Sequence, residues 1–302
     1  MKTVFIDGDQ GTTGLRIRQR LEGRTDLTLL SLPEEERKLL LSRIALAKQA
    51  DVTLLCLPDE ASAELVAALG AQEGRILDAS TAHRTDPRFV YGFPQLTPSR
   101  PEEIARARRV AIPGCHAGGS VALVAPLRQA GLLDENALLS LTSFTGYSGG
   151  GKKMIAQYQA PDRDPHLQGP RPYAVAQTHK HLKEIQAVCG LRCPPVFQPV
   201  VCDQYSFMLV SLPLHPQMLS RPMGPEDLRQ VYQAHYQNSP VVRVLPVNPE
   251  LSLDSLALSG SDAMEIFVTG NPERMIVYAR FDNLGKGASG AAVQNLQLML
   301  GL

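Results

Sequence analysis

The first 130 residues alternate between short, almost continuously apolar runs and longer segments in which apolar positions recur with a helical period. Apolar runs of this kind predict strands buried on both faces, as in a parallel sheet covered by helices on each side. The pattern therefore predicts an α/β domain. Its expected strands are residues 3–7, 27–31, 52–58, 74–80 and 109–114, and its expected helices are residues 15–23, 35–50 and 60–70.

The pattern changes after about residue 135, where the apolar runs lengthen, alternate with polar positions in places and have fewer helices between them. Such runs predict a mixed or antiparallel sheet with helices on one face, and hence an α+β second domain. They are residues 138–146, 199–215, 241–247 and 264–270.

The last 15 residues, 288–302, predict a helix rich in small residues. We expect this helix to return to the first domain, because glycine and alanine permit close backbone approach. The expected organisation is therefore a first domain of residues 1–116 and 283–302, with residues 117–282 inserted as the second domain.

Composition narrows the possible functions. The 302 residues carry 30 basic and 30 acidic side chains, so no long-range field favours nucleic acid or an anionic membrane as a partner. The N-terminus turns polar too early for a secretory signal, and no apolar run approaches the roughly 20 residues of a membrane helix. An odd count of five cysteines indicates free thiols in a reducing compartment. We expect a soluble cytoplasmic protein.

A glycine-rich loop directly follows the first predicted strand and precedes a helix. Its glycines have the spacing G-x-x-G-x-x-G, which provides a tight turn, close backbone approach and exposed helix N–H groups for a pyrophosphate. In its βαβ context it predicts a Rossmann-type, doubly wound dinucleotide-binding domain, although a plain strand-to-helix turn is the alternative. The expected cofactor contacts in this loop are Gly8, Gly11, Thr12, Thr13 and Gly14.

The end of the second predicted strand indicates which dinucleotide binds. NAD sites usually carry an acidic residue there, whereas this strand ends at Ser31 and is followed by Arg37. A hydroxyl and a guanidinium suit a 2′-phosphate, so we expect NADP(H). The alternative is that Arg37 is only a solvated helix charge.

Cys115 lies between a strand end and the start of an apolar helix, with glycine and histidine as neighbours. A helix N-terminus favours the thiolate, which attacks carbonyl carbon, so this residue is the candidate nucleophile. Cys56, inside an apolar strand, fits the alternative of a small buried core residue. The pair Cys189 and Cys193 makes only a weak zinc signal, and we expect no metal.

The candidate acid/base lies in the stretch THKHLKEI, which contains His179 and His181. Thr178 resembles a helix N-cap, and Glu184 would share a helix face with His181. A base that titrates near neutral pH suits a cysteine mechanism, while a metal pair or a surface turn is the alternative. The other histidines are less suitable. They are His83, His116, His166, His215 and His235.

Two further glycine-rich segments indicate anion binding. The loop at 147–153 contains Ser148 and Lys152, and successive glycine amides there can form a nest for phosphate or carboxylate, although a flexible loop is the alternative. The stretch at 283–290 opens the last helix and suits the amide or the phosphates of a cofactor. Its expected cofactor contacts are Asn283, Lys286 and Gly287.

Several stretches together resemble the N-acetyl-γ-glutamyl-phosphate reductase family in its shorter form, which comprises NADPH enzymes of arginine biosynthesis. The resemblance spans residues 8–295 and implies a fold similar to aspartate-semialdehyde and glyceraldehyde-phosphate dehydrogenases. Longer family members carry H-x-H-x-P-E, and here Lys183 stands where their proline would be. The stretches are GDQGTTG, LDASTAHRTD, YGFPQL, AIPGCHAGG, GYSGGGKKMI, THKHLKEI and NLGKGASGAAVQN.

The resemblance implies that Cys115 attacks an acyl phosphate to form a thioester, that NADPH reduces it to a semialdehyde, and that His179 is the acid/base. Substrate contacts would come from His181, Arg84, Ser148, Lys152 and Glu184. It also implies a homodimer or homotetramer.

Three alternative functions stay open at this point. Aspartate-semialdehyde dehydrogenase uses the same chemistry, and an acylated aminoadipyl phosphate is only one methylene longer than the expected substrate. A dinucleotide-sensing regulatory protein would need no nucleophile.

Overall fold

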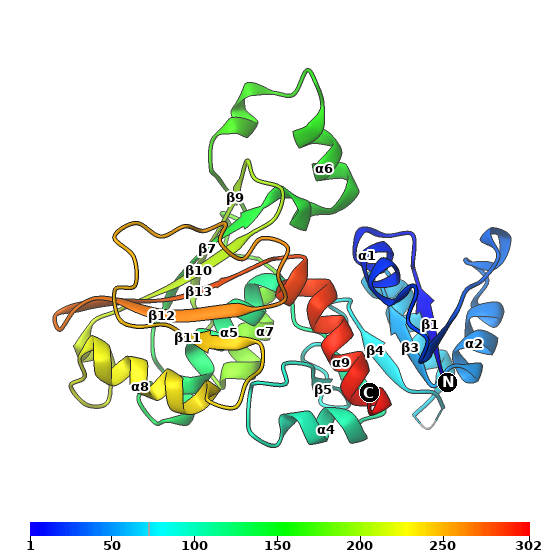
Figure 1. Ribbon diagram of the computed structural model, residues 1–302, viewed down its shortest axis with the longest axis horizontal. Coiled ribbons are helices and arrows are strands. Elements are labelled where there is room, and N and C mark those ends of the chain that lie inside the picture. The colour runs from blue at the N-terminus through cyan, green and yellow to red at the C-terminus, as the bar shows by residue number, and fades with distance from the viewer. Residues whose placement is uncertain (72) are drawn as a thin grey trace. The chain divides into compact units, whose positions relative to one another are not determined.

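The computed structural model describes residues 1–71 and 73–302 and divides the chain into two compact units (Figure 1). The first unit comprises Met1–Pro94, Pro98–Gly114 and Ala288–Leu302, and the second comprises Gln95–Thr97 and Cys115–Gly287. Residues 283–287, which the sequence placed with the last helix, therefore belong to the second unit, as do Cys115 and His116.

The first unit contains a six-stranded sheet in the order β2-β1-β3-β4-β6-β5, and the strand pairs that the structure describes run parallel. The predicted doubly wound parallel sheet is therefore confirmed. The second predicted helix is shorter than expected, because Glu34–Glu36 forms a separate 3₁₀ turn. The strands are β1 (Lys2–Asp7), β2 (Leu27–Leu30), β3 (Val52–Leu55), β4 (Ile76–Asp78), β5 (Val90–Tyr91) and β6 (Arg109–Ala111); the helices are α1 (Thr12–Leu21), α2 (Leu40–Gln49), α3 (Asp59–Leu69), α4 (Arg100–Arg106) and α9 (Gly290–Leu300).

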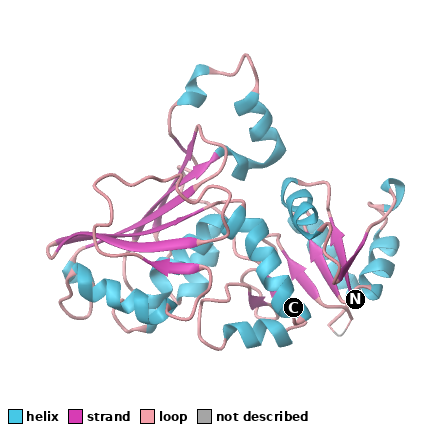
Figure 2. Cartoon of the chain, viewed as in Figure 1, coloured by secondary structure: helices cyan, strands magenta, loops and turns pink. Residues whose placement is uncertain are grey.

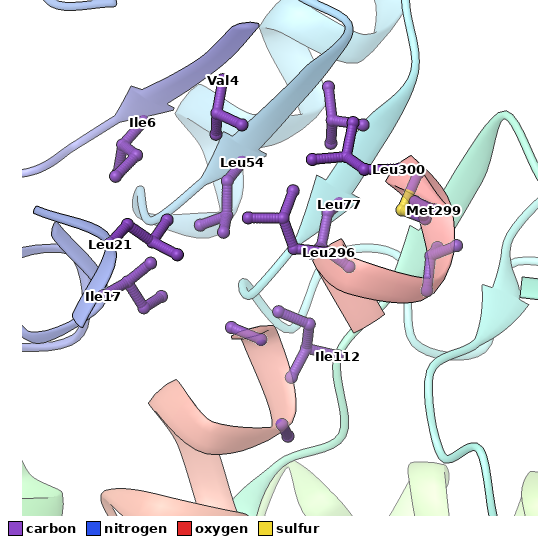
Figure 3. Packing of buried hydrophobic residues seen from close by; sticks show 14 of the residues in the cluster. Val4, Ile6, Ile17, Leu21, Leu54, Leu77, Ile112, Leu296, Met299 and Leu300 are labelled. Carbon is purple, nitrogen blue, oxygen red and sulfur yellow. The ribbon is translucent and has the colours of Figure 1, made fainter. Parts of the chain in front are cut away.

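Apolar side chains cover both faces of this sheet. Figure 3 shows one face, where residues of α1 and α9 meet residues of β1, β3 and β4, among them Ile17, Leu54 and Leu296. On the other face Phe5 and Leu55 pack with Leu65 of α3. Full burial of such a side chain contributes about 1.5–3 kcal/mol. The expected return of the last helix to the first domain is confirmed, with Ala291 and Ala292 in the same cluster.

The second unit contains a seven-stranded mixed sheet in the order β11-β12-β13-β10-β7-β9-β8 (Figure 2). The pairs β7/β9 and β11/β12 are parallel, and the other neighbours are antiparallel, as the α+β prediction required. The strands are β7 (Ser140–Gly146), β8 (Arg171–Pro172), β9 (Val196–Cys202), β10 (Met208–Leu214), β11 (Val242–Val244), β12 (Met264–Asn271) and β13 (Arg274–Phe281); the helices are α5 (Cys115–Gln129), α6 (Gly151–Gln159), α7 (His181–Cys189) and α8 (Pro225–Tyr236).

Two features of the second sheet differ from the sequence prediction. The single run expected at 199–215 is two strands, β9 and β10, separated by a bend at 203–207. Strand β13 was not predicted. It follows β12 after a turn at Pro272 and Glu273 and pairs with β12 along its whole length. In the part of the chain that the structure describes, no helix has the length and apolar character needed to cross a bilayer.

Candidate active site

Helix α5 begins at Cys115 and packs against strands β10 and β13 of the second sheet. A Cβ added at Gly119 would lie 2.6 Å from Val210 and 2.7 Å from Phe281, so the small residue allows the helix to approach the sheet. The predicted strand-to-helix setting of Cys115 is therefore confirmed. Its half-buried thiol lies in the first turn, where the helix dipole stabilises a thiolate.

The other cysteines have different surroundings, and none of the five forms a disulfide. Burial raises the pKa of the thiols of Cys56 and Cys202, and it raises that of Cys189 to about 12. These thiols therefore stay protonated, as core residues do. Cys193 is exposed.

The side chain that follows Cys115 forms a buried polar chain. His116 Nδ1 lies 2.7 Å from Ser143 Oγ on β7, and its Nε2 lies 2.6 Å from the hydroxyl of Tyr173. Burial and the nearby His179 lower the pKa of His116 to about 3. His116 is therefore a neutral ring with both nitrogens engaged. The sequence analysis had set this histidine aside.

His179 and His181 complete an imidazole cluster with His116. The centroid of the His116 ring lies 5.6 Å from each of the other two centroids, which are 4.7 Å apart. Burial, and then the charge of Lys180, lower the pKa of His179 to about 4. The expectation that His179 titrates near neutral pH is therefore wrong for the free protein, because burial and the neighbouring Lys180 charge disfavour the charged ring.

Helix α7 positions this cluster, but it begins later than predicted. Its first residue is His181, with Lys180 rather than Thr178 at the N-cap position. His181 and Glu184 are both buried, on one side of the helix, as expected from their spacing.

The predicted anion nest at 147–153 is only partly available. The backbone N–H of Tyr147 donates to Gln204 O, and that of Ser148 donates to Tyr205 O. The buried Ser148 hydroxyl accepts a bond from the Asn283 amide at 3.1 Å. Because a hydroxyl can donate while it accepts, this bond is compatible with donation from Ser148 to an anionic substrate, and that contact stays a prediction. Lys152 is exposed on α6.

Two of the predicted cofactor contacts at 283–287, Asn283 and Lys286, make hydrogen bonds within the second unit. Asn283 also accepts a bond from Phe207 N–H, at 3.0 Å. Lys286 is buried, donates to Gln95 Oε1 at 2.8 Å, and has its pKa lowered to about 7 by burial. A Cβ at Gly287 would lie 3.1 Å from Cys115 Cβ. This segment therefore packs beside Cys115 through Gly287, and contact of these residues with a cofactor stays a prediction.

The glycine loop of the first unit fits a dinucleotide phosphate. Gly8 has φ +89°, and a Cβ there would lie 2.5 Å from Cys56 O, so glycine is required. A Cβ at Gly14 would collide with Gly8 O, so Gly14 brings α1 close to β1. Among the described residues no side chain caps the helix at Gly11, which leaves the amides of Thr12 and Thr13 in the open first turn.

The remaining predicted residues also lie in the first unit. Ser31 is exposed just after β2, and Arg37 donates to Leu32 O at 3.3 Å. Arg84 donates to Ala79 O at 3.1 Å in the loop after β4.

Sequence reasoning missed two polar groups. Tyr173 lies far from Cys115 in sequence, and only the pairing of β8 with β9 brings it to His116. In the first unit, His83 Nδ1 lies 2.6 Å from the buried Asp78, which also accepts from Ser80. Both partners of that pair stand in the stretch LDASTAHRTD, where the short spacing was a usable signal.

Comparison with known families agrees with the two units. Residues 18–106 match the family model described as semialdehyde dehydrogenase, NAD binding domain, and residues 115–283 match semialdehyde dehydrogenase, dimerisation domain. Solved structures of aspartate semialdehyde dehydrogenase are similar in fold. The Vibrio cholerae enzyme II has a TM-score of 0.74 at 16% identity, covering 100% of this chain and 98% of that one. The Candida albicans enzyme has 0.66 at 14%, covering 99% and 98%.

Curated relatives are much closer in sequence. N-acetyl-γ-glutamyl-phosphate reductase 2 of Pseudomonas putida is 45% identical over 99% of this chain and 96% of its own length. N-acetyl-γ-glutamyl-phosphate reductase of Rhizobium meliloti is 44% identical over 98% of both chains, and that of Burkholderia lata is 42% identical over 99% and 96%. With identity at this level along nearly the whole chain, the protein belongs to the N-acetyl-γ-glutamyl-phosphate reductase family of semialdehyde dehydrogenases.

Proposed function

We propose that this enzyme reduces N-acetyl-γ-glutamyl phosphate to N-acetylglutamate semialdehyde with NADPH, releasing phosphate, as a step of arginine biosynthesis. The observation that carries the proposal is the half-buried Cys115 thiol in the first turn of α5, next in sequence to His116, which forms an imidazole cluster with His179 and His181. The names of relatives up to 45% identical support the substrate.

The reaction proceeds through a thioester. The Cys115 thiolate attacks the acyl carbon, the bond from that carbon to the phosphate oxygen breaks, and phosphate leaves. A nicotinamide dinucleotide held by the loop between β1 and α1 would supply the hydride, so that the thioester carbon is reduced and its oxygen becomes an oxyanion. The oxyanion then re-forms a carbonyl, the carbon–sulfur bond breaks, and the thiolate is regenerated as the semialdehyde departs. The net proton consumed ends on phosphate.

The chain supplies position and charge for this reaction. Amides in the first turn of α5 stabilise the oxyanion, an effect worth about 3–4 kcal/mol per donor in other enzymes. His179 acts on the same oxygen. Contacts to the anionic groups of the substrate come from Arg84 and Lys152, and His181 and Glu184 shape the site beside His179.

The cofactor assignment rests on the loop between β1 and α1. The uncapped first turn and the required glycines suit the pyrophosphate of a nicotinamide dinucleotide. Ser31 and Arg37 at the end of β2 support the 2′-phosphate of NADP(H) over the hydroxyl of NAD(H).

The substrate is tested by a reverse assay. The purified enzyme is supplied with phosphate, NADP⁺ and N-acetylglutamate semialdehyde, and reduction of the cofactor is followed by absorbance. A parallel series uses aspartate semialdehyde and the acetylated aminoadipate semialdehyde. We expect the highest kcat/KM with N-acetylglutamate semialdehyde. A preference for either other aldehyde would reassign the substrate.

Assembly and location form a further part of the proposal. The match of residues 115–283 to a dimerisation domain supports a homodimer or homotetramer formed through the second unit. Light scattering after size exclusion measures this directly, and a monomer would contradict it. A catalytic thiol and four further unpaired cysteines suit the reducing cytoplasm.

A further inference from the structure

His179 is held in one tautomer by the backbone beside it. The backbone N–H of His181 donates to His179 Nδ1 at 3.2 Å. A ring nitrogen that accepts a hydrogen bond carries no proton, so the neutral ring carries its proton on Nε2. Nε2–H is then a donor, and the ring has no second lone pair with which to accept a proton from substrate.

The segment that carries His179 is fixed on both sides. Before it, the Gln177 side chain donates to Phe197 O and accepts from Phe197 N–H, both at 2.9 Å, as a neighbouring strand would. Gln177 itself has φ +57°. After it, Leu182 N–H donates to His179 O at 3.0 Å. The bond to Nδ1 is therefore built into the connection between β8 and α7, which the Gln177 side chain ties to β9.

The surroundings of the ring favour its neutral form. The rings of Tyr173 and Phe197 have centroids 5.7 Å and 5.4 Å from that of His179. From α5 it faces His116, which is neutral, and from its own segment it faces His181 and the cation Lys180. Protonation of His179 would place a positive charge in a buried position close to the charge of Lys180. Both effects disfavour the charged ring, in agreement with its lowered pKa.

We propose that His179 acts as a neutral hydrogen-bond donor to the acyl oxygen through Nε2–H, rather than as an acid or base that transfers a proton. This inference rests on the proposed function. The balanced reaction needs no proton on that oxygen, because each oxyanion collapses by expelling phosphate or the Cys115 thiolate. A neutral imidazole donor stabilises both oxyanions without changing its own charge.

The tautomer is measured directly by NMR on the full-length enzyme labelled with ¹⁵N-histidine. The signals of His179 are assigned by their loss in His179→Gln. At neutral pH we expect Nδ1 to show the shift of an unprotonated nitrogen and Nε2 that of a protonated one, with no titration down to about pH 5. A charged ring, or a proton on Nδ1, would overturn the proposal.

Kinetics of two amide variants separate donation from proton transfer. The amide nitrogen of Gln overlays Nε2 of histidine, whereas that of Asn overlays Nδ1. We expect His179→Gln to keep kcat within about tenfold of the unaltered enzyme and His179→Asn to lose a factor of about 10²–10³, the loss seen for a missing oxyanion donor. The exposed His166→Gln, as control, should leave kcat unchanged.

Equal and large losses in His179→Gln and His179→Asn would show proton transfer, since neither amide can titrate. The pH profile of kcat/KM gives a second readout, because a neutral donor predicts the same profile for the unaltered enzyme and for His179→Gln. If the unaltered enzyme did not use the proposed substrate, the proposed function would fail while the NMR result on the tautomer still stood.

Discussion

At the scale of single residues, the five cysteines differ in burial, and for three of them burial raises the pKa of the thiol. Cys115 is half-buried in the first turn of α5, whereas burial raises the pKa of the thiols of Cys56, Cys189 and Cys202. The sequence neighbours of Cys115 were enough to predict its place at a strand-to-helix turn, because a run of proline, glycine and small residues marks such a turn.

The first prediction concerns the nucleophile. Cys115→Ala should lower kcat by a factor on the order of 10⁴ or more, because no thioester can form. NADPH binding, followed by its fluorescence, should stay near normal. The exposed Cys193→Ala is the control and should keep full activity. Appreciable turnover by Cys115→Ala would rule out covalent catalysis.

The second prediction concerns cofactor choice. Arg37→Ala should reduce the preference for NADPH over NADH, measured as the ratio of kcat/KM values, because a charge-assisted contact worth roughly 1.5–3 kcal/mol is lost. The nearby exposed Lys38→Ala serves as control for a simple change in charge. The assignment fails if both variants change the ratio equally, or if the unaltered enzyme uses both cofactors alike.

At the scale of elements, α5 carries Cys115, the proposed nucleophile, and the position of this helix depends on close packing against β10 and β13. Gly119 has Val210 and Phe281 directly beneath it. A movement of this helix away from the sheet would move Cys115 with it.

The third prediction follows from that packing. Gly119→Ala should destabilise the protein by about 1–3 kcal/mol, because the added methyl overpacks the interface. It should lower kcat as well. Gly169→Ala is a matched control, since its φ is −88° and an added Cβ meets nothing within 4 Å. Chemical denaturation compares the two. Equal free energies of unfolding for Gly119→Ala and Gly169→Ala would show that α5 accommodates the added methyl group without loss of stability.

Most elements of the first unit were predictable because each has its own local apolar pattern, whereas the short β5 and α4 were not predicted. The site was harder to predict. Tyr173 reaches His116 only through the pairing of β8 with β9, and the tautomer of His179 depends on one backbone bond. Burial likewise lowers the pKa of His179, and the spacing of HKH carries no information on burial. The site was therefore hard to predict because its contacts join residues that are far apart in the sequence or depend on backbone geometry.

At the scale of the whole molecule, the buried histidines link stability to pH. The folded pKa values of His116, about 3, and His179, about 4, lie below the ordinary value of 6.5. Between these values the unfolded chain binds more protons than the folded protein. Their contribution to stability is complete above about pH 6.5 and is lost as the pH falls toward 4 and then 3.

The fourth prediction is a decline of the free energy of unfolding from pH 7 to pH 4, measured in urea at each pH. The slope should correspond to as many as two protons from these rings. His116→Phe, which cannot titrate, should reduce the slope by about one proton, and the exposed His166→Gln is the control. An unchanged slope in His116→Phe would refute the assignment.

The short segment Gln95–Thr97 belongs to the second unit, although the chain on either side of it belongs to the first. Gln95 Oε1 accepts from the buried Lys286, and Leu96 O accepts from Gln129 Nε2 at 3.0 Å. The second unit therefore cannot be exchanged between related proteins as residues 115–287 alone. A gene fragment for residues 115–287 alone would lack these acceptors, so a folded chimaera should take residues 95–97 from the same protein as residues 115–287.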